Sequence, residues 1–168
     1  MATPDSKKRL PRKLAQRLAD EKAIAAQHKA RTTGIAENAL VLSADTVVAV
    51  GRRILPKAED EATARKCLEL LSGRRHRVFS AIALKSPDGT LREKLSETNV
   101  RFKRLSKEEI AAYLATGEPF DKAGAYGIQG GGAVLVDALH GSYSGVVGLP
   151  LTETRQLLHW ANVPYWKQ

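Results

Sequence analysis

The sequence predicts an α/β fold with a mixed sheet, rather than a purely parallel one, flanked by helices. Segments with helical and with strand periodicity alternate along the chain, and in the middle two extended segments flank a tight-turn sequence. The length of 168 residues suits one domain with a single hydrophobic core. We therefore expect residues 1–168 to form a single domain.

The first two elements are expected to be a helix and a strand. Proline is tolerated in the first turn of a helix, so a helix is expected from Pro11 to about Arg31. Its apolar positions at helical spacing are Leu14, Leu18, Ala23 and Ile24. Residues 39–50 are rich in Val and Leu and end at Gly51, which predicts a strand.

Turn and capping residues mark the remaining elements. Asp60 can cap a helix that ends at Ser72-Gly73, and Ser106 with Glu109 has the spacing of a capping box for a helix through Leu114. The expected hairpin pairs residues 75–84 with 91–102 across the turn 86–89. After the capping-box helix we expect a Gly-rich stretch (121–132), a strand (133–139), a loop (141–148) and a final helix (150–161).

Composition and charge restrict the class of protein. The single cysteine, Cys67, cannot form an internal disulfide, which fits the reducing cytoplasm. No stretch approaches the roughly 20 apolar residues of a membrane helix, and the charged N-terminus is unlike a signal peptide. Of the net charge of +9, most lies in residues 1–31, which hold nine Lys or Arg and three acids. These basic residues lack interleaved aromatics, so a solvated helix face is favoured over a nucleic-acid patch.

A carboxylate inside an apolar strand is the first candidate for chemistry. Asp45 and Thr46 lie between Val41-Leu42 and Val47-Val48, where an ionised carboxylate is costly to bury unless it is paired or bound to a metal. Spacing alone leaves a second interpretation open, in which Asp45 caps a turn at the strand end.

Two further segments combine cations with loop residues. Lys57 follows Leu55-Pro56 in the connection after the Asp45 strand, where a lysine is either solvated or close to a bound phosphate. The Gly-rich stretch carries Lys122 and Gln129, and repeated glycine lets backbone N–H groups approach an anion. The amide of Gln129 has a donor and an acceptor for reading a base, whereas a flexible surface loop is the alternative.

Six strings together resemble the Maf-like family of nucleoside triphosphate pyrophosphatases, in the branch that hydrolyses dTTP and UTP. They include SADTVV and DKAGAYGIQG, and they span Ser43–Val48, Ile54–Lys57, Leu70–Val78, Tyr113–Pro119, Asp121–Gly130 and Gly141–Leu151. The resemblance implies an elongated α/β fold with a central cleft, a divalent cation such as Mg²⁺ or Mn²⁺, and cleavage between the α and β phosphates. It also suggests a homodimer.

The resemblance assigns roles to particular residues. It implies that Asp45 is the catalytic carboxylate, activating water or holding the metal, and that Lys57 and Lys122 bind the substrate phosphates. Thr46 and Gln129 would select the base, and pyrimidine nucleotides are expected because the family's methylated-GTP branch differs at these two positions.

One family feature has no counterpart in this sequence. Family members open with a strand and a Ser-x-Ser-Pro-Arg-Arg turn that binds the triphosphate, and no such string occurs here. The domain is therefore expected to be truncated at its N-terminus relative to the family. Either the gene start is misplaced, which we favour, or the chain is a weakened or inactive nucleotide-binding relative.

Overall fold

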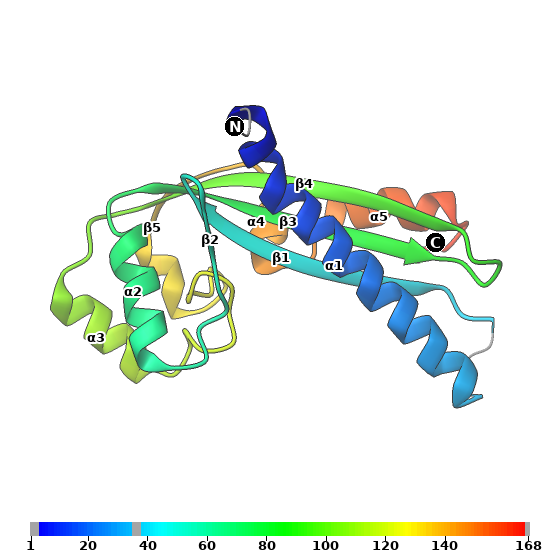
Figure 1. Ribbon diagram of the computed structural model, residues 1–168, viewed down its shortest axis with the longest axis horizontal. Helices are drawn as coiled ribbons and strands as arrows, with labels where there is room; N and C mark the ends of the chain where they lie inside the picture. The colour runs from blue at the N-terminus through cyan, green and yellow to red at the C-terminus, as the bar shows by residue number, and fades with distance from the viewer. Residues whose placement is uncertain (1–3, 35–37, 167–168) are drawn as a thin grey trace.

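The computed structural model describes residues 4–34 and 38–166. Its strands are β1 (Val41–Val50), β2 (Arg53–Leu55), β3 (Arg75–Lys85), β4 (Leu91–Phe102) and β5 (Val136–His140). Its helices are α1 (Pro4–Thr32), α2 (Glu61–Leu71), α3 (Lys107–Ala115), the 3₁₀ helix η1 (Gly131–Leu135), α4 (Tyr143–Val147) and α5 (Leu151–Trp160). The predicted α/β class is confirmed, with helices on both sides of an elongated sheet (Figure 1).

The strand order is β2-β1-β3-β4-β5, and every pairing between these strands is antiparallel. The expected parallel component of a mixed sheet is therefore not found in the described residues. The reason lies in the two long connections, from β1 to β3 and from β4 to β5, each of which leaves and re-enters the sheet at the same end. Ala49 near the end of β1 pairs with Arg77 near the start of β3, and Phe102 at the end of β4 pairs with Val136 at the start of β5. Consecutive long strands must then run in opposite directions.

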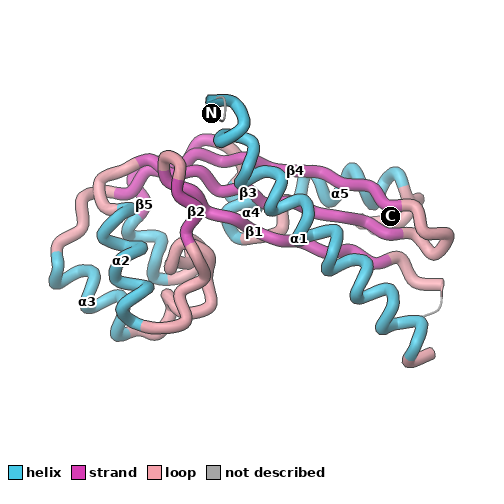
Figure 2. The backbone as a smooth tube through the Cα atoms, in the orientation of Figure 1, coloured by secondary structure: helices cyan, strands magenta, loops and turns pink. Residues whose placement is uncertain are grey.

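These two connections form a compact lobe beside one end of the sheet (Figure 2). The lobe contains α2, α3, η1 and the Gly-rich segment, and it shares a hydrophobic cluster with the sheet around Leu68, Leu71 and Phe102. Cys67 is buried in this cluster, as its place on the apolar helix face predicts.

Helix α1 covers one face of the sheet and differs in two ways from the expected helix. It begins at Pro4, so Pro11 lies inside it rather than in its first turn. Of the four predicted apolar positions only Ala23 is buried, whereas Leu14 and Leu18 are partly buried and Ile24 is half exposed. The buried positions recur every four residues, at Pro11, Ala15, Ala19, Ala23 and Gln27.

The short side chains of this stripe explain its position. Ala15, Ala19 and Ala23 lie in one cluster with Phe79 and Val47 of the sheet. Methyl groups allow the helix backbone to approach the strands, so that the hydroxyl of Ser43 in β1 donates to the carbonyl of Ala19 at 2.6 Å. The larger side chains of Leu14 and Leu18 are therefore only partly buried, beside the stripe rather than between the helix and the sheet.

The opposite face of the sheet is covered by α4 and α5. Leu157 of α5 packs on Ile82 and Leu84 of β3. Helix α4 lies close to β4, because a Cβ added at Gly145 would stand 2.7 Å from the hydroxyl oxygen of Ser96. The predicted loop at 141–148 thus contains a short helix, whose N-cap Ser142 accepts from the N–H of Gly145.

Local signals located most boundaries correctly. Asp60 caps α2 by accepting from the N–H of Thr63, and the capping box of Ser106 and Glu109 begins α3. The strand predicted from residue 133 begins only at Val136, because the preceding residues form η1. The three-residue strand β2 was not predicted.

Candidate active site

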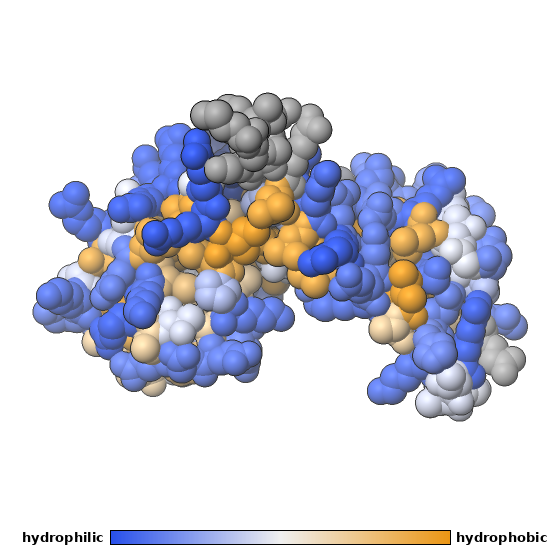
Figure 3. Space-filling view, viewed as in Figure 1, coloured by the Kyte–Doolittle hydropathy of each residue, from blue (hydrophilic) through white to orange (hydrophobic). Residues whose placement is uncertain are grey.

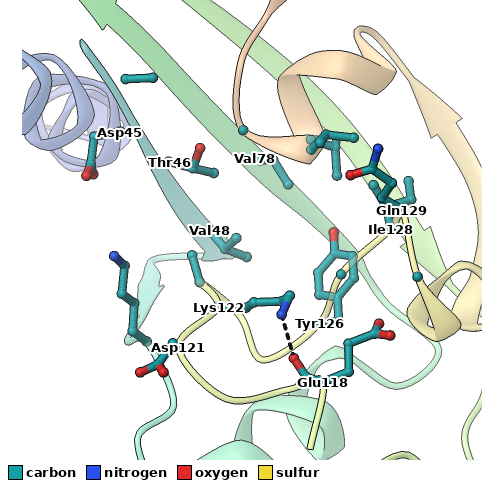
Figure 4. Close-up of a pocket in the computed structure, with 18 of the residues that line it drawn as sticks. Asp45, Thr46, Val48, Val78, Glu118, Asp121, Lys122, Tyr126, Ile128 and Gln129 are labelled. Atoms are coloured by element: carbon teal, nitrogen blue, oxygen red, sulfur yellow. Dashed lines mark hydrogen bonds between the residues drawn. The ribbon is translucent and has the colours of Figure 1, made fainter.

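A cavity of about 580 Å³ lies between the central part of the sheet and the lobe. In the space-filling view a notch separates the lobe from α1 and the far end of the sheet (Figure 3). The five candidate residues of the sequence all line this cavity, namely Asp45, Thr46, Lys57, Lys122 and Gln129. Figure 4 shows Asp45 beside α1, with Gln129 on the opposite wall.

Asp45 lies in the middle of β1, so the interpretation as a turn cap is wrong. Only 8% of the residue is exposed, and its carboxylate forms an ion pair with the ammonium group of Lys22 from α1. The same ammonium group donates to the carbonyl of Ala44 at 3.3 Å. This pairing offsets the cost of burying the carboxylate, and it leaves a charged acceptor at the cavity wall.

A backbone bridge holds the segments that carry the two cavity lysines, Lys57 and Lys122, next to each other. Lys57 forms an isolated antiparallel bridge with Ala123, the residue after Lys122. Gly124 follows with a φ of 73°, and a Cβ there would approach the side chain of Val48 to 3.0 Å. Only glycine permits both this conformation and this close contact with β1. The bridge and the glycine therefore place both lysines along one side of the cavity.

Glu118 fixes the part of the Gly-rich segment that carries Gln129. Its carboxylate accepts from the N–H groups of Gly131 and Gly132 at 2.8 and 2.9 Å and from the hydroxyl of Tyr113 at 2.6 Å. Burial raises the pKa of Glu118, but these hydrogen bonds outweigh it and the pKa lies below its usual value. The carbonyl of Glu118 also accepts from the ammonium group of Lys122 at 2.9 Å (Figure 4).

A chain of hydroxyl groups determines the hydrogen-bonding character of Thr46. The hydroxyl of Ser80 donates its single proton to the carbonyl of Gly145 at 2.5 Å, so it can only accept from Thr46, whose oxygen lies 2.8 Å away. The proton of Thr46 is therefore already used. What Thr46 offers to a ligand in the cavity is an acceptor.

The base of the cavity contains a buried aromatic cluster. The Tyr126 hydroxyl and the Nε2 atom of His76 are 2.8 Å apart, and both rings meet Phe102 edge to face. Burial lowers the pKa of His76 to about 4 and raises the pKa of Tyr126. Both side chains are therefore neutral at neutral pH, and the wall formed by Tyr126 carries no charge.

This burial of His76 predicts a loss of stability in weak acid. Because the unfolded chain binds a proton near pH 6.5 and the folded chain only near pH 4, the free energy of unfolding should fall as the pH drops through this interval. Between pH 7 and pH 5 the loss from this group amounts to about 2 kcal/mol. Urea unfolding at both pH values measures it. The variant His76→Gln should lose that part of the pH dependence, and an unchanged dependence would contradict the assignment to His76.

The carboxylate of Asp45 fits a divalent cation that is held together with substrate phosphates. In the described part of the chain, no group of three or more His, Cys, Asp or Glu side chains could bind a metal ion on its own. Asp45 nevertheless supplies a hard carboxylate oxygen at the cavity wall. Magnesium is often bound by one or two carboxylates together with substrate phosphates, and the residues present fit this arrangement.

Sequence reasoning missed three residues that the structure brings to the site. Lys22 had been counted with the solvated basic face of the first helix, although it pairs with Asp45. Glu118 and Ser80 act through hydrogen bonds to segments distant in the sequence. Glu118 lies within the string Tyr113–Pro119 that carries the family resemblance, which is the only sequence signal that pointed toward it.

Fold and site together define an α/β protein with a cleft that is lined by both lysines and carboxylates and has a size suited to a small ligand. A family model described as Maf-like protein matches residues 2–161, and the chain belongs to this family.

Curated relatives agree with this family assignment. A protein of Novosphingobium aromaticivorans named dTTP/UTP pyrophosphatase is 63% identical over 153 residues, covering 91% of this chain and 73% of the relative. Proteins of the same name from Chelativorans sp. and Paramagnetospirillum magneticum are 57% and 58% identical, covering 88% and 89% of this chain and 71% and 75% of the relatives.

Proposed function

We propose that this chain is a nucleoside triphosphate pyrophosphatase that hydrolyses dTTP and UTP to the monophosphate and pyrophosphate. The observation that carries the proposal is one cavity holding the buried carboxylate of Asp45 with the lysines Lys57 and Lys122. The names of relatives more than half identical over most of the chain support the same substrates. Both substrates are pyrimidine nucleotides.

Phosphoanhydride hydrolysis needs charge neutralisation and a positioned water more than covalent catalysis. Lys57 and Lys122 neutralise the phosphate chain from one side of the cavity. Asp45 accepts a proton from water as the water oxygen attacks the α phosphorus, and the bond from this phosphorus to the bridging oxygen breaks, so that pyrophosphate leaves. Lys22 holds the carboxylate of Asp45 in place through their ion pair while the substrate is absent.

A divalent cation, Mg²⁺ or Mn²⁺, would be held by Asp45 together with the substrate phosphates, and it would supply further charge neutralisation. Because no described set of protein ligands is sufficient by itself, the cation and the nucleotide are expected to bind together. To hold the cation, the carboxylate of Asp45 would have to share or give up the ion pair that it forms with Lys22 in the structure.

Thr46 and Gln129 read the base in this proposal. Uracil and thymine present an N–H group at the ring position where cytosine presents an acceptor. The acceptor of Thr46, fixed by Ser80, therefore favours uracil or thymine over cytosine. Gln129 adds an amide with both a donor and an acceptor.

The experiment is product analysis with dTTP, UTP, CTP and GTP in the presence of magnesium. Monophosphate and pyrophosphate are expected from dTTP and UTP, with slower turnover of CTP. Diphosphate and orthophosphate would instead place the cleavage at the β–γ bond and contradict the proposal. Nucleotide binding without turnover would identify the chain as the inactive relative.

The cellular context is inferred from the same resemblance. In the described ranges, none of the helices has the length and apolar character needed to cross a bilayer. We place the enzyme in the cytoplasm, where its nucleotide substrates are found, and we expect a homodimer. Sedimentation or light scattering of the purified chain tests the second statement.

A further inference from the structure

A second groove, of about 490 Å³, lies on the sheet away from the active-site cavity. It is lined by residues of β3, β4 and β5 at the end of the sheet from which the lobe extends (Figure 1), namely Arg75, Asn99, Val100, Arg101, Ala138 and His140. None of them lines the active-site cavity. The pyrophosphatase activity proposed above does not use this groove.

Strand register places the polar side chains of the groove on one face. Arg75 pairs directly with Arg101, which in turn pairs with Ala138, so these three residues form one row across three strands. Asn99 pairs with His140 in the next row. Directly paired residues of an antiparallel sheet point to the same side. Ala138 is small, and the space beside it lies between the two arginines and the imidazole.

Two arginines face each other in this row, and only one of them has a carboxylate partner among the described residues. Like charges directly opposite each other on neighbouring strands destabilise a sheet, and their Cβ atoms are about 5 Å apart. Among the described residues, Arg75 has no ion pair or side-chain hydrogen bond, whereas Arg101 contacts Asp137 at 2.6 Å through one terminal nitrogen. The other N–H groups of Arg101 remain available.

Around the groove the four guanidinium groups of Arg12, Arg75, Arg77 and Arg101 outnumber their two carboxylate partners, Glu97 and Asp137. Arg77 lies on the same face and pairs with Asn99 in the register. Its guanidinium group and that of Arg12 both form an ion pair with the carboxylate of Glu97. Asp137 is not part of the groove lining. The lining itself contains two guanidinium groups, an amide and an imidazole, and it contains no carboxylate.

We propose that this groove is a binding site for a phosphoryl-bearing anion. Guanidinium groups bind phosphoryl oxygens through two parallel N–H donors, and two opposed guanidinium groups suit an anion with several such oxygens. The amide of Asn99 and the imidazole of His140 add further hydrogen-bond donors beside them. A bound anion would also offset the charge of Arg75, which has no carboxylate partner among the described residues. A stacked nucleic acid strand is disfavoured, because the lining has no Phe, Tyr or Trp side chain.

The phosphoryl group could belong to free pyrophosphate or to a nucleotide, and the test separates these sources. Backbone amide signals of Asn99, Arg101 and His140 are followed by NMR while pyrophosphate, UMP or sulfate is added without a divalent cation. Saturable shifts at these signals with pyrophosphate are expected, separate from those of Gln129 and Gly130 in the active-site cavity. Saturation by UMP as well would extend the site to nucleotide phosphates.

Matched variants test the role of the arginine pair. Arg75→Gln is expected to weaken the groove's affinity for pyrophosphate at least tenfold while the response of Gln129 and Gly130 is unchanged. Arg52→Gln removes the same charge from an exposed position in the turn after β1 and should alter the affinity less than twofold.

Three results would overturn the proposal. The first is no groove response at millimolar pyrophosphate, the second is an equal response to sulfate, and the third is an affinity unchanged in Arg75→Gln. Because neither variant touches the active-site cavity, each of these results would leave the proposed hydrolysis of dTTP and UTP standing.

Discussion

Replacement of Asp45 by Asn is expected to lower the rate of pyrophosphate release from dTTP and UTP by a factor on the order of 10²–10⁴. The amide has nearly the shape of the carboxylate, but it cannot accept the proton of the attacking water and binds a divalent cation poorly. Steady-state release of pyrophosphate under saturating magnesium measures the effect. The loss should appear in kcat rather than in KM alone, because the carboxylate acts in the transition state.

Asp121 provides the matched control. It also lines the cavity, it is exposed, and its φ of 61° is one that asparagine adopts as readily as aspartate. Asp121→Asn therefore makes the same chemical change in the same cavity and should retain most of the activity. Equal losses in the two variants would mean that the charge of the cavity, not the position of Asp45, matters. Unfolding curves of both variants show whether the fold is intact.

Replacement of Phe79 by Ala is expected to lower the free energy of unfolding by about 3–5 kcal/mol. Phe79 is fully buried in β3, where it packs between Val47 of β1 and the alanine stripe of α1. Truncation removes the apolar contacts and leaves a cavity under the helix, which close packing cannot fill without movement of α1. Urea unfolding at neutral pH measures the loss.

The control for Phe79 is Val134→Ala, because Val134 is 72% exposed. Its effect should stay within about 0.5 kcal/mol. Phe79→Ala should also reduce activity, because α1 carries Lys22 and the next residue of β3, Ser80, positions Thr46. A loss below about 1 kcal/mol would show that α1 repacks freely on the sheet, contrary to the close contact described here.

Local signals in the sequence predicted most of the fold, and they failed where distant contacts decide the structure. Caps at Asp60 and Ser106 depend on residues three positions away, so spacing was sufficient. Residues 133–135 are apolar and resemble a strand, but N–H groups of the two preceding glycines bind Glu118, and the chain stays turned until Val136. Helix periodicity identified Ala23 but not Ala15 or Ala19 of the buried stripe of α1, because alanine gives a weak apolar signal.

The candidate site was predicted residue by residue, whereas its connections were not. Asp45 was conspicuous because a carboxylate is rare inside an apolar strand. Its partner Lys22 lies on a helix with many other cations, and nothing in the spacing separates it from them. Thr46 was assigned to base selection, but the direction of its hydrogen bond follows only from Ser80 and Gly145, which folding brings together.

The alanine stripe of α1 gives the helix an asymmetric tolerance to substitution. Glycine or serine at Ala15, Ala19 or Ala23 would leave the helix seated on the sheet, whereas any bulkier residue must lift it away. Lys22 precedes the last of these alanines, so lifting the helix would separate its ammonium group from Asp45. Substitutions at these three alanines, none of which lines the cavity, would therefore be tolerated only as far as they preserve the contact between Lys22 and Asp45 in the cleft.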